Sequence, residues 1–394
     1  MNFITKMITI ATLAAVAVSC SDKAAKDDFK YLVDEFADLK IMRYKVPGWD
    51  ALTLQQKEYI YHLAEAAKYG RDIIWMQNCR HNLEIRKVLE NIIENYGGDR
   101  TDGEYRKFET YAKRVFFSNG IHHHYAEDKF FPECSQEYFQ SLMTAVGDGD
   151  KCAELLPVIY DPAIYPARKD MHADDIVAAS AVNFYENVTR KEVESLYAAM
   201  ADPDDKTPVS YGLNSRVVKG EDGIVREETY KVGGLYGPAL EKICEELEKA
   251  ASVAENDTQK AYIADLIAYY RSGDLKLWDE YNFKWVKDID GTVDFVNGFV
   301  EDYNDPLGRK ATYEGLVNFK DAEASRRTEL ISDNAQWFED NSPVDPRFKK
   351  EEVKGVTAKV INVAALAGDC YPAAPIGINL PNADWIRREH GSKS

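Results

Sequence analysis

Two carboxamides separated by a proline lie near the end of the chain, in the segment Ile376-Gly-Ile-Asn-Leu-Pro-Asn382. Apolar neighbours would bury part of this segment, and a buried amide needs hydrogen-bond partners. If the amide oxygens of Asn379 and Asn382 converge, they form a site for a cationic donor such as an ammonium group. Asp294 or Glu301, on an earlier predicted helix, could supply the negative charge. The alternative is a turn in which both Asn side chains bond only the backbone.

Three consecutive histidines, His122, His123 and His124, are the other conspicuous group. Adjacent side chains in a loop rarely all reach one ion, and a metal site needs further ligands from elsewhere. Three interpretations stay open: a metal site, a polar loop lining a cleft, and an ordinary exposed or half-buried loop. The motifs H-E-x-x-H, G-x-S-x-G and G-x-G-x-x-G do not occur, and neither does a P-loop. On motifs alone the chain has no recognisable catalytic machinery.

The elements that must position these residues are mainly helical. Apolar residues recur three and four apart, which predicts helices over residues 54–69, 81–96, 104–118, 174–200, 238–253, 258–271, 275–287, 292–303 and 318–339. Residues 211–232 predict a β-hairpin, because two apolar runs flank Lys219-Gly-Glu-Asp-Gly223. Residues 353–366 and 375–381 predict strands or buried connectors. The fold class expected is α+β, predominantly helical with a minor sheet.

Length and charge limit the class of protein. A chain of 394 residues predicts two or three domains. Hydrophobic residues make up 45% of it and charged residues 29%, which is ordinary for a globular protein. The formal net charge of −18 disfavours broad contact with nucleic acid or anionic lipid, since both need a positive surface.

The first residues predict export. Lys6 precedes an apolar run, residues 7–18, that is shorter than the roughly 20 residues needed to span a bilayer. The run ends in Ala17-Val-Ser-Cys20, which resembles a bacterial lipobox. On this interpretation residues 1–19 are a signal peptide, Cys20 carries lipid, and residues 20–29 are a tether. The chain would then be anchored to the cell envelope, on its periplasmic or outer surface. The alternative is a signal peptide cut elsewhere, with Cys20 incidental.

The other five cysteines do not form a recognisable framework. They are Cys79, Cys134, Cys152, Cys244 and Cys370. Their number is odd and no C-x-x-C occurs, so neither a disulfide scaffold nor a zinc knuckle is indicated. We expect buried thiols, with one disulfide possible in an oxidising compartment.

Four stretches resemble the dipeptidyl peptidase III family, zinc-dependent enzymes that remove dipeptides from peptide amino termini. They are Phe36-Ala-Asp-Leu-Lys-Ile-Met-Arg-Tyr44, Gly70-Arg-Asp-Ile-Ile-Trp75, Asn297-Gly-Phe-Val-Glu-Asp-Tyr-Asn-Asp-Pro-Leu-Gly308 and Pro375-Ile-Gly-Ile-Asn-Leu-Pro-Asn382. The resemblance covers nearly all of residues 30–394, and the string Gly-Ile-Asn-Leu-Pro-Asn is specific.

The resemblance implies a two-lobed metallopeptidase with a small β-barrel or sheet in the lower lobe and zinc in a helical upper lobe. Residues 30–315 would belong to the lower lobe, residues 316–350 would be an excursion into the upper lobe, and residues 351–394 would return as lower-lobe strands. The implied partner is an oligopeptide substrate. The sequence does not indicate the oligomeric state.

The resemblance also assigns residues to a substrate site. Asn379 and Asn382 match the paired Asn residues that bind the substrate's free amine. Asp294 matches a Glu that binds the same amine, and it carries the same negative charge on a shorter side chain. Pro375 and Ile376 match positions that line the pocket for the second residue from the substrate's amino end. A site that holds the terminal ammonium would place the scissile bond two residues away, so that cleavage releases a dipeptide.

The family's zinc motif, H-E-x-x-G-H, follows the Asn pair in its members and does not occur in these 394 residues. We find no zinc ligands here, although the full-length enzyme would need zinc. We therefore expect this chain to be an amino-terminal portion that is inactive alone. Two other hypotheses stay open: a surface lipoprotein that captures peptide amino termini without cutting them, and a structural lipoprotein with no small ligand.

Overall fold

The computed structural model describes residues 28–353, 356–357 and 359–394. Cys20 and the apolar run 7–18 lie outside these ranges, so the lipid anchor stays a prediction. Within the described ranges, no helix has both the length and the apolar character needed to cross a membrane. The chain divides into two compact units, Met1–Lys45 and Val46–Ser394.

The described part of the first unit is an antiparallel hairpin. Strand β1 (Leu32–Phe36) pairs with β2 (Leu39–Met42), and the register places Phe36 opposite Leu39. Ala37, in the turn, takes a φ of 48°. Positive φ values match the twist of a two-residue hairpin turn.

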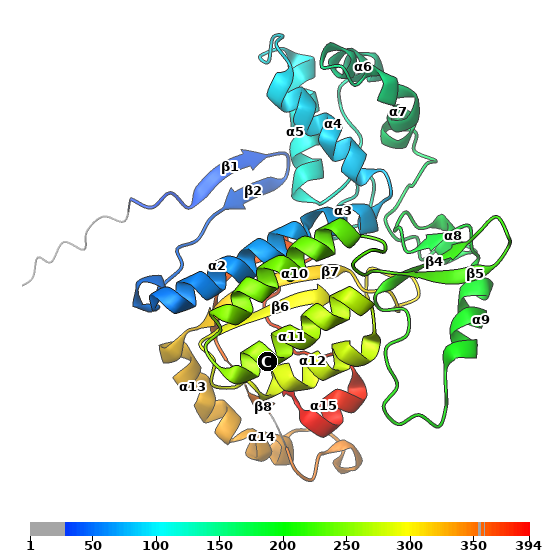
Figure 1. The fold of residues 1–394 in the computed structure, drawn as a ribbon. Helices are drawn as coiled ribbons and strands as arrows, with labels where there is room; N and C mark the ends of the chain where they lie inside the picture. The colour runs from blue at the N-terminus through cyan, green and yellow to red at the C-terminus, as the bar shows by residue number, and fades with distance from the viewer. Residues whose placement is uncertain (1–27, 354–355, 358) are drawn as a thin grey trace, which may run out of the picture. The chain divides into compact units, whose positions relative to one another are not determined.

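The largest cluster of the second unit packs helices against a three-stranded sheet, as Figure 1 shows. The helices are α2 (Leu54–Tyr69), α10 (Gly237–Ser252), α11 (Asp257–Ser272) and α12 (Leu275–Lys287). The strands, all antiparallel in the order β6-β7-β9, are β6 (Val293–Phe299), β7 (Tyr313–Lys320) and β9 (Ile361–Gly368). The four helices predicted over residues 54–69, 238–253, 258–271 and 275–287 are confirmed.

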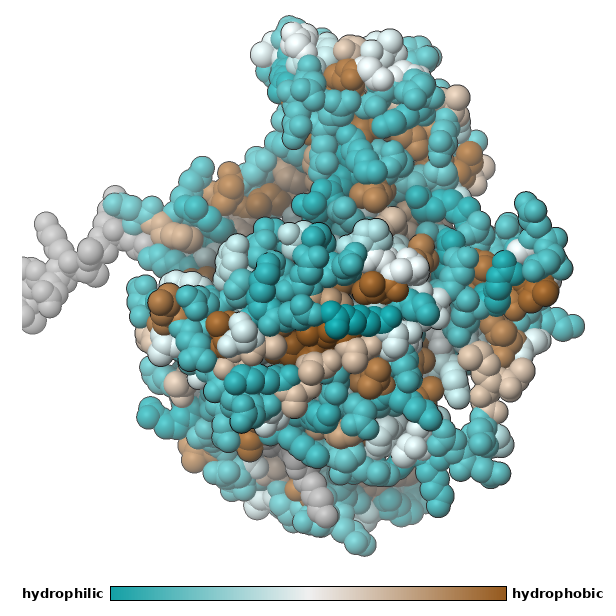
Figure 2. Space-filling view, viewed as in Figure 1, coloured by the Kyte–Doolittle hydropathy of each residue, from teal (hydrophilic) through white to brown (hydrophobic). Residues whose placement is uncertain are grey.

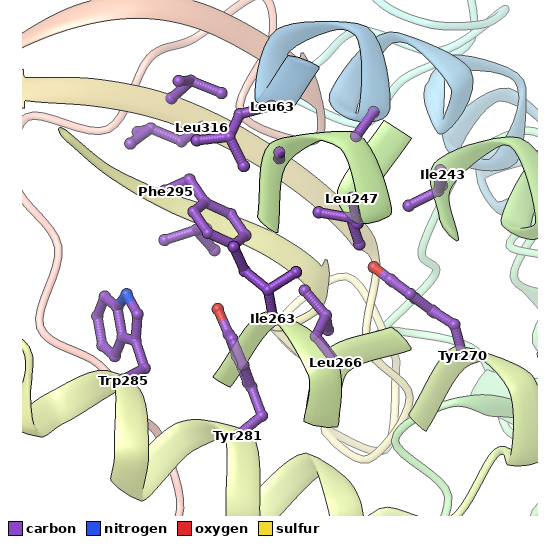
Figure 3. Close-up of a cluster of buried hydrophobic side chains, with 14 of the residues drawn as sticks. Leu63, Ile243, Leu247, Ile263, Leu266, Tyr270, Tyr281, Trp285, Phe295 and Leu316 are labelled. Carbon is purple, nitrogen blue, oxygen red and sulfur yellow. The ribbon is translucent and has the colours of Figure 1, made fainter. Parts of the chain in front are cut away.

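The core of this cluster lies where the apolar stripes of the helices meet the sheet (Figure 3). Leu63 of α2, Leu247 of α10 and Ile263 of α11 lie around Phe295 of β6 and Leu316 of β7, and each is at most 2% exposed. Burying an apolar side chain of this size stabilises the fold by roughly 1.5–3 kcal/mol. On the face that Figure 2 shows, hydrophilic residues cover most of the outer surface of α10–α12.

The helix boundaries have local causes. Thr53 and Gln56 form a capping box that starts α2, with Thr53 N donating to Gln56 Oε1 at 2.9 Å. Asn256 caps α11, and Gly273 ends it with a φ of 77°. That conformation is open to glycine at little cost and satisfies the last carbonyl groups of a helix.

The prediction of a helix over residues 292–303 is wrong, because this segment forms β6 and its continuation. Every residue of β6 except Asp294 is buried. A strand buried on both faces carries apolar residues at all spacings, including three and four, so its periodicity imitates that of a helix.

A second cluster consists of helices alone. It contains α3 (Arg71–Asn78), α4 (Asn82–Asn95), α5 (Gly103–Phe117), α6 (Gln136–Ala145), η2 (Gly149–Lys151) and α7 (Cys152–Tyr160). Phe108 and Phe139 meet edge to face in its centre, with ring centroids 5.2 Å apart. The helices predicted over residues 81–96 and 104–118 are confirmed.

A third cluster combines a small sheet with two helices. Strands β3 (Tyr185–Glu186), β4 (Ser215–Lys219) and β5 (Val225–Thr229) lie beside α8 (Ile176–Ala179) and α9 (Arg190–Met200). The predicted hairpin is confirmed in β4 and β5. The single helix predicted over residues 174–200 is wrong, because β3 interrupts it. Asn187 takes a φ of 55° after β3, and Thr189 and Glu192 then form the capping box of α9.

The last part of the chain is described by short elements. They are α13 (Ala322–Asp333), α14 (Ala335–Asn341), η3 (Pro346–Phe348), β8 (Val356–Thr357), α15 (Asp384–His390) and β10 (Ser392–Lys393); η1 (Trp49–Ala51) precedes α2. The helix predicted over residues 318–339 begins later, because β7 continues to Lys320 and Asp321 caps α13. It also breaks at Asn334.

The fold is therefore α+β and predominantly helical, as predicted, and its sheets are small. Part of the segment predicted over residues 353–366 is β9. The prediction of a strand or buried connector over residues 375–381 is wrong for most of that segment, because only Leu380 forms a β-bridge and residues 375–377 and 379 are exposed. The division into lower and upper lobes stays a prediction.

Candidate functional site

The carboxamide segment lies between the end of β9 and the start of α15, and one buried residue holds it in place. Leu380 is 5% exposed and pairs with Lys393 through two backbone hydrogen bonds. Leu380 N donates to Lys393 O at 3.1 Å, and Lys393 N donates to Leu380 O at 2.9 Å. Because Leu380 points inward, the exposed side chains of Asn379 and Asn382 on either side of it are left on the surface.

Asn382 presents one acceptor. Its Nδ2 donates to Val300 O at 3.3 Å and to Glu301 Oε2 at 2.9 Å. These two bonds use both amide protons, so Oδ1 is the polar atom that remains. Among the described residues, no donor reaches that oxygen. It is therefore available to a ligand that donates hydrogen bonds.

Asn379 shares a cavity with Glu301. Both line an open cavity of about 610 Å³, together with Pro375 and Ile376, the two residues predicted to line a substrate pocket. Asn379 Oδ1 accepts one long hydrogen bond, from Ser394 Oγ at 3.4 Å. Glu301 thus connects the two carboxamides, through a direct bond to Asn382 and a shared cavity with Asn379.

Asp294 has hydrogen-bond partners other than the carboxamide pair. Its Oδ1 accepts hydrogen bonds from Trp285 Nε1 and Phe295 N, both at 2.8 Å. Its Oδ2 accepts from Lys393 Nζ at 2.9 Å. Asp294 lines a second cavity, of about 400 Å³, and residues 375–378 line both cavities. No hydrogen bond within the described ranges joins Asp294 to Asn379 or Asn382.

The larger cavity has an acidic wall that includes Glu301, Glu314 and Asp369. Burial raises the pKa of each of these carboxyl groups, and Asp369 and Glu301 raise the pKa of Glu314 further by repulsion. Cys370 Sγ donates to Glu314 Oε2 at 3.7 Å. Sequence reasoning missed Glu314 and Asp369. Glu314 could have been found because it is the single carboxylate in the mainly apolar stretch Tyr313–Lys320.

Two cations that already have a partner also line this cavity. Arg168 Nη2 lies 3.5 Å and Lys169 Nζ 3.7 Å from Glu127 Oε1. Lys169 Nζ also donates to Tyr303 O at 2.5 Å. The lining of the cavity therefore combines these carboxyl groups with two cations that Glu127 partly neutralises.

The three histidines have different hydrogen-bond partners and surroundings. His122 is buried, its Nε2 lies 2.9 Å from Tyr165 O, and burial lowers its pKa to about 4. His123 Nδ1 accepts from the backbone N–H groups of Tyr125 and Ala126. His124 stacks on His123 and lines the larger cavity. Of the three interpretations, His124 fits that of a cleft-lining loop.

The residues present do not fit a zinc ion. Among the described residues, no group of three or more His, Cys, Asp or Glu is arranged to hold a metal. The five described cysteines are buried thiols, as predicted, and they are free, so the one disulfide that the sequence left possible is not formed among them. Burial raises the pKa of Cys79 and Cys244 to about 11, which disfavours the thiolate form that binds metals.

Comparisons with known proteins agree on one family. The family model described as peptidase family M49 matches residues 176–394. Dipeptidyl peptidase 3 of Dictyostelium discoideum is 26% identical over 380 residues, which is 88% of this chain and 53% of the relative. Dipeptidyl peptidase 3 of Homo sapiens is 24% identical over 391 residues, 87% of this chain and 52% of the relative. The chain therefore spans about half the length of these relatives.

Solved structures share the fold. The structure of DPP III from Caldithrix abyssi matches with a TM-score of 0.64 at 21% identity, and the match covers 89% of this chain and 55% of that one. Dipeptidyl-peptidase III from Corallococcus sp. strain EGB matches with a TM-score of 0.62 at 18% identity and covers the same shares.

Proposed function

The chain belongs to peptidase family M49, and on that premise we propose that it recognises the free amino terminus of a peptide as part of a zinc-dependent dipeptidyl peptidase III. Peptidases of this family have peptide substrates, so a peptide is the partner to expect. Binding the terminal ammonium at a fixed distance from the scissile bond would set the length of the released product at two residues.

One observation carries this proposal: the side chain of Asn382 uses both of its amide protons on Val300 and Glu301. A terminal ammonium has three donors and no acceptor, so it needs oxygen atoms around it. The remaining Oδ1 of Asn382, Asn379 in the neighbouring cavity and a carboxylate supply such atoms. Asn379 and Asn382 are the residues that the sequence predicted for this role.

We assign no catalytic step to zinc in these residues, because the described residues contain no group that fits it. A bound zinc ion in such an enzyme would activate water for attack on the peptide bond. We propose that residues 1–394 alone bind peptides without hydrolysing them. Incubation with zinc and a dipeptidyl-arylamide substrate tests this, since release of the arylamine above the buffer rate would contradict it.

The binding experiment compares one labelled peptide with its amino-acetylated form by fluorescence anisotropy. Acetylation removes the positive charge, so we expect the affinity to fall roughly 10- to 100-fold, the range for a charge-assisted hydrogen bond. Equal affinity for both peptides would refute amine recognition. Asn379→Ala and Asn382→Ala should each weaken binding of the free peptide more than that of the acetylated one.

We further propose that Cys20 carries lipid and anchors the protein to the cell envelope. The support is the Ala17-Val-Ser-Cys20 string after an apolar run. The mass of the mature protein tests it: we expect a chain that begins at Cys20 and carries acyl groups, and Cys20→Ser should abolish both. A mature chain with another first residue and no lipid would contradict this proposal.

A further inference from the structure

We propose that one end of the β1–β2 hairpin docks on the phospholipid headgroups of the membrane to which Cys20 would anchor the protein. This end, residues 28–33 and 42–45, is called the open end, and residues 34–41 are called the turn end. The inference rests on the lipid anchor proposed above and adds a second contact with the same membrane, made by side chains.

Large apolar side chains gather at the open end. Leu32 and Met42 lie opposite each other in the register, and together with Val33 they are between 39% and 48% exposed. Tyr44 is 73% exposed. Among the described residues, no third strand pairs with β1 or β2. A two-stranded hairpin is at best marginally stable in water, and a cluster of exposed apolar residues marks a contact surface.

The two ends of the hairpin carry opposite charges. The open end holds three basic residues, Lys30, Arg43 and Lys45, and one acidic residue, Asp28. The turn end holds three acidic residues and one lysine. Basic residues beside aromatic and apolar ones are typical of segments that lie at a membrane interface, where the cations meet anionic headgroups. Charge and apolar surface therefore favour the same end of the hairpin.

Phe29 holds two of these cations beside the apolar side chains. The guanidinium carbon of Arg43 lies 4.7 Å, and Lys45 Nζ 5.4 Å, from the centroid of the Phe29 ring. Arg43 Nε also donates to Lys30 O at 2.7 Å. A guanidinium has five N–H donors, so Arg43 retains donors for a phosphate group.

The position of Cys20 in the chain brings the open end to the bilayer. Phe29 follows Cys20 by nine residues, and an extended chain covers at most about 3.6 Å per residue. The open end therefore stays within roughly 30 Å of a lipidated Cys20. Tethering over a short distance gives a local concentration in the millimolar range, so that even a weak affinity for headgroups suffices for docking.

The rest of the chain is poorly suited to this contact. Residues 1–45 contain seven basic and six acidic residues, so the net charge of −18 comes entirely from residues 46–394. Anionic headgroups repel such a protein surface. The membrane contact should therefore be confined to the hairpin.

The test tethers the protein to vesicles without using Cys20. A histidine tag replaces residues 1–19, Cys20→Ser removes the acylation site, and the vesicles contain phosphatidylethanolamine, phosphatidylglycerol and a nickel-chelating lipid. An environment-sensitive dye is attached at Val33→Cys in the open end or at Asp38→Cys in the turn end, roughly 15 Å away along the strands. The five described native cysteines are buried, which directs the dye to the new thiol.

We expect the emission of the dye at position 33 to shift to the blue on vesicles, and the emission at position 38 to change less. Absence of a shift at position 33, or an equal or larger shift at position 38, would overturn the inference. The protein density on the vesicles is varied as well. A shift that appears only at high density would mean that the open end pairs with a second copy of the chain, which also overturns it.

Met42→Thr with Tyr44→Thr removes apolar surface from the open end and should reduce the docking equilibrium constant roughly tenfold or more. Leu330→Ala with Phe338→Ala is the matched control, because these side chains of α13 and α14 are 68% and 50% exposed. The control should keep the shift at position 33. An equal loss in both variants would contradict a contact made by the hairpin, and thermal melts of each variant show whether it folds.

The result does not depend on acylation, because the tag supplies the tether. If the dye shifts but the mature chain carries no lipid, the lipid anchor fails and the hairpin contact stands. If Cys20 is acylated but the dye does not shift, the anchor stands and this inference fails.

Discussion

Lys393 places its ammonium nitrogen 2.9 Å from Asp294 Oδ2 and above the ring of Trp285. The carboxylate that the family resemblance assigns to a substrate amine is therefore bonded to an amine of the chain itself. The two residues lie 99 positions apart, so the pair joins β6 to the final described strand. A carboxylate that matches a ligand-binding position of the family, such as Asp294, can thus form an ion pair within the protein instead.

The ion pair should contribute to stability. In Lys393→Met the aliphatic stem is retained, but the partly buried carboxylate of Asp294 loses its cation. We expect the free energy of unfolding to fall by about 1–3 kcal/mol, which is less than for a fully buried pair because Asp294 keeps two other donors. Urea denaturation followed by circular dichroism measures this change.

A double-mutant cycle provides the control for that measurement. Asp294→Asn combined with Lys393→Met removes both charges, so it should cost less than the sum of the two single substitutions. Additive changes would mean that the two residues do not interact in solution.

Gly70 has a packing role that a substitution can reveal. A Cβ atom at this position would lie 1.9 Å from Cε1 of Tyr313, whose ring is fully buried. Tyr313 cannot move easily, because its hydroxyl accepts a hydrogen bond from Asn297 Nδ2 at 3.0 Å. We therefore expect Gly70→Ala to lower the free energy of unfolding by about 1–3 kcal/mol, as overpacking of a core does.

Gly97 offers a matched control, since nothing lies within 4 Å of a Cβ atom built there. Gly97→Ala should leave the protein equally stable or more stable by about 0.4–1 kcal/mol, because alanine restricts the unfolded chain. Equal unfolding midpoints for the two variants would contradict the packing argument.

Helices with one polar face could be predicted well from the sequence. Residues 54–69 and 275–287 were predicted with the bounds of α2 and α12, because one face of each helix meets water and produces a clear period. The β4–β5 hairpin was also predictable, since a glycine-rich turn separates two apolar runs.

The remaining elements depend on tertiary contacts that local patterns do not record. β6 resembles a helix in sequence because it is buried on both faces. The site shows the same limit. The spacing of Asn379 and Asn382 is visible in the sequence, whereas the pairing of Lys393 with Asp294 depends on how the last residues return to Leu380. Sequence spacing cannot show whether a distant lysine will form its ion pair with Asp294 or with Glu301.

His122 should make the protein acid-sensitive. Its pKa is lowered to about 4, chiefly by burial and also by the positive charges of Arg168 and Lys129, while its bond to Tyr165 O opposes the shift. The unfolded histidine, with a pKa near 6.5, takes up a proton between about pH 6.5 and 4, and the folded one does not. The stability contribution is therefore complete above about pH 6.5 and is lost as the pH falls toward 4.

The loss due to His122 should reach about 2 kcal/mol between pH 7 and pH 5, from the linkage between the two pKa values. His122→Gln removes the titrating group and retains an N–H donor for Tyr165 O, so the free energy of unfolding of this variant should fall less over the same interval. Carboxylates titrate in both proteins, and the difference between the two isolates His122. Parallel pH profiles, measured by urea denaturation at each pH, would show that His122 is protonated as readily in the folded protein as in the unfolded chain.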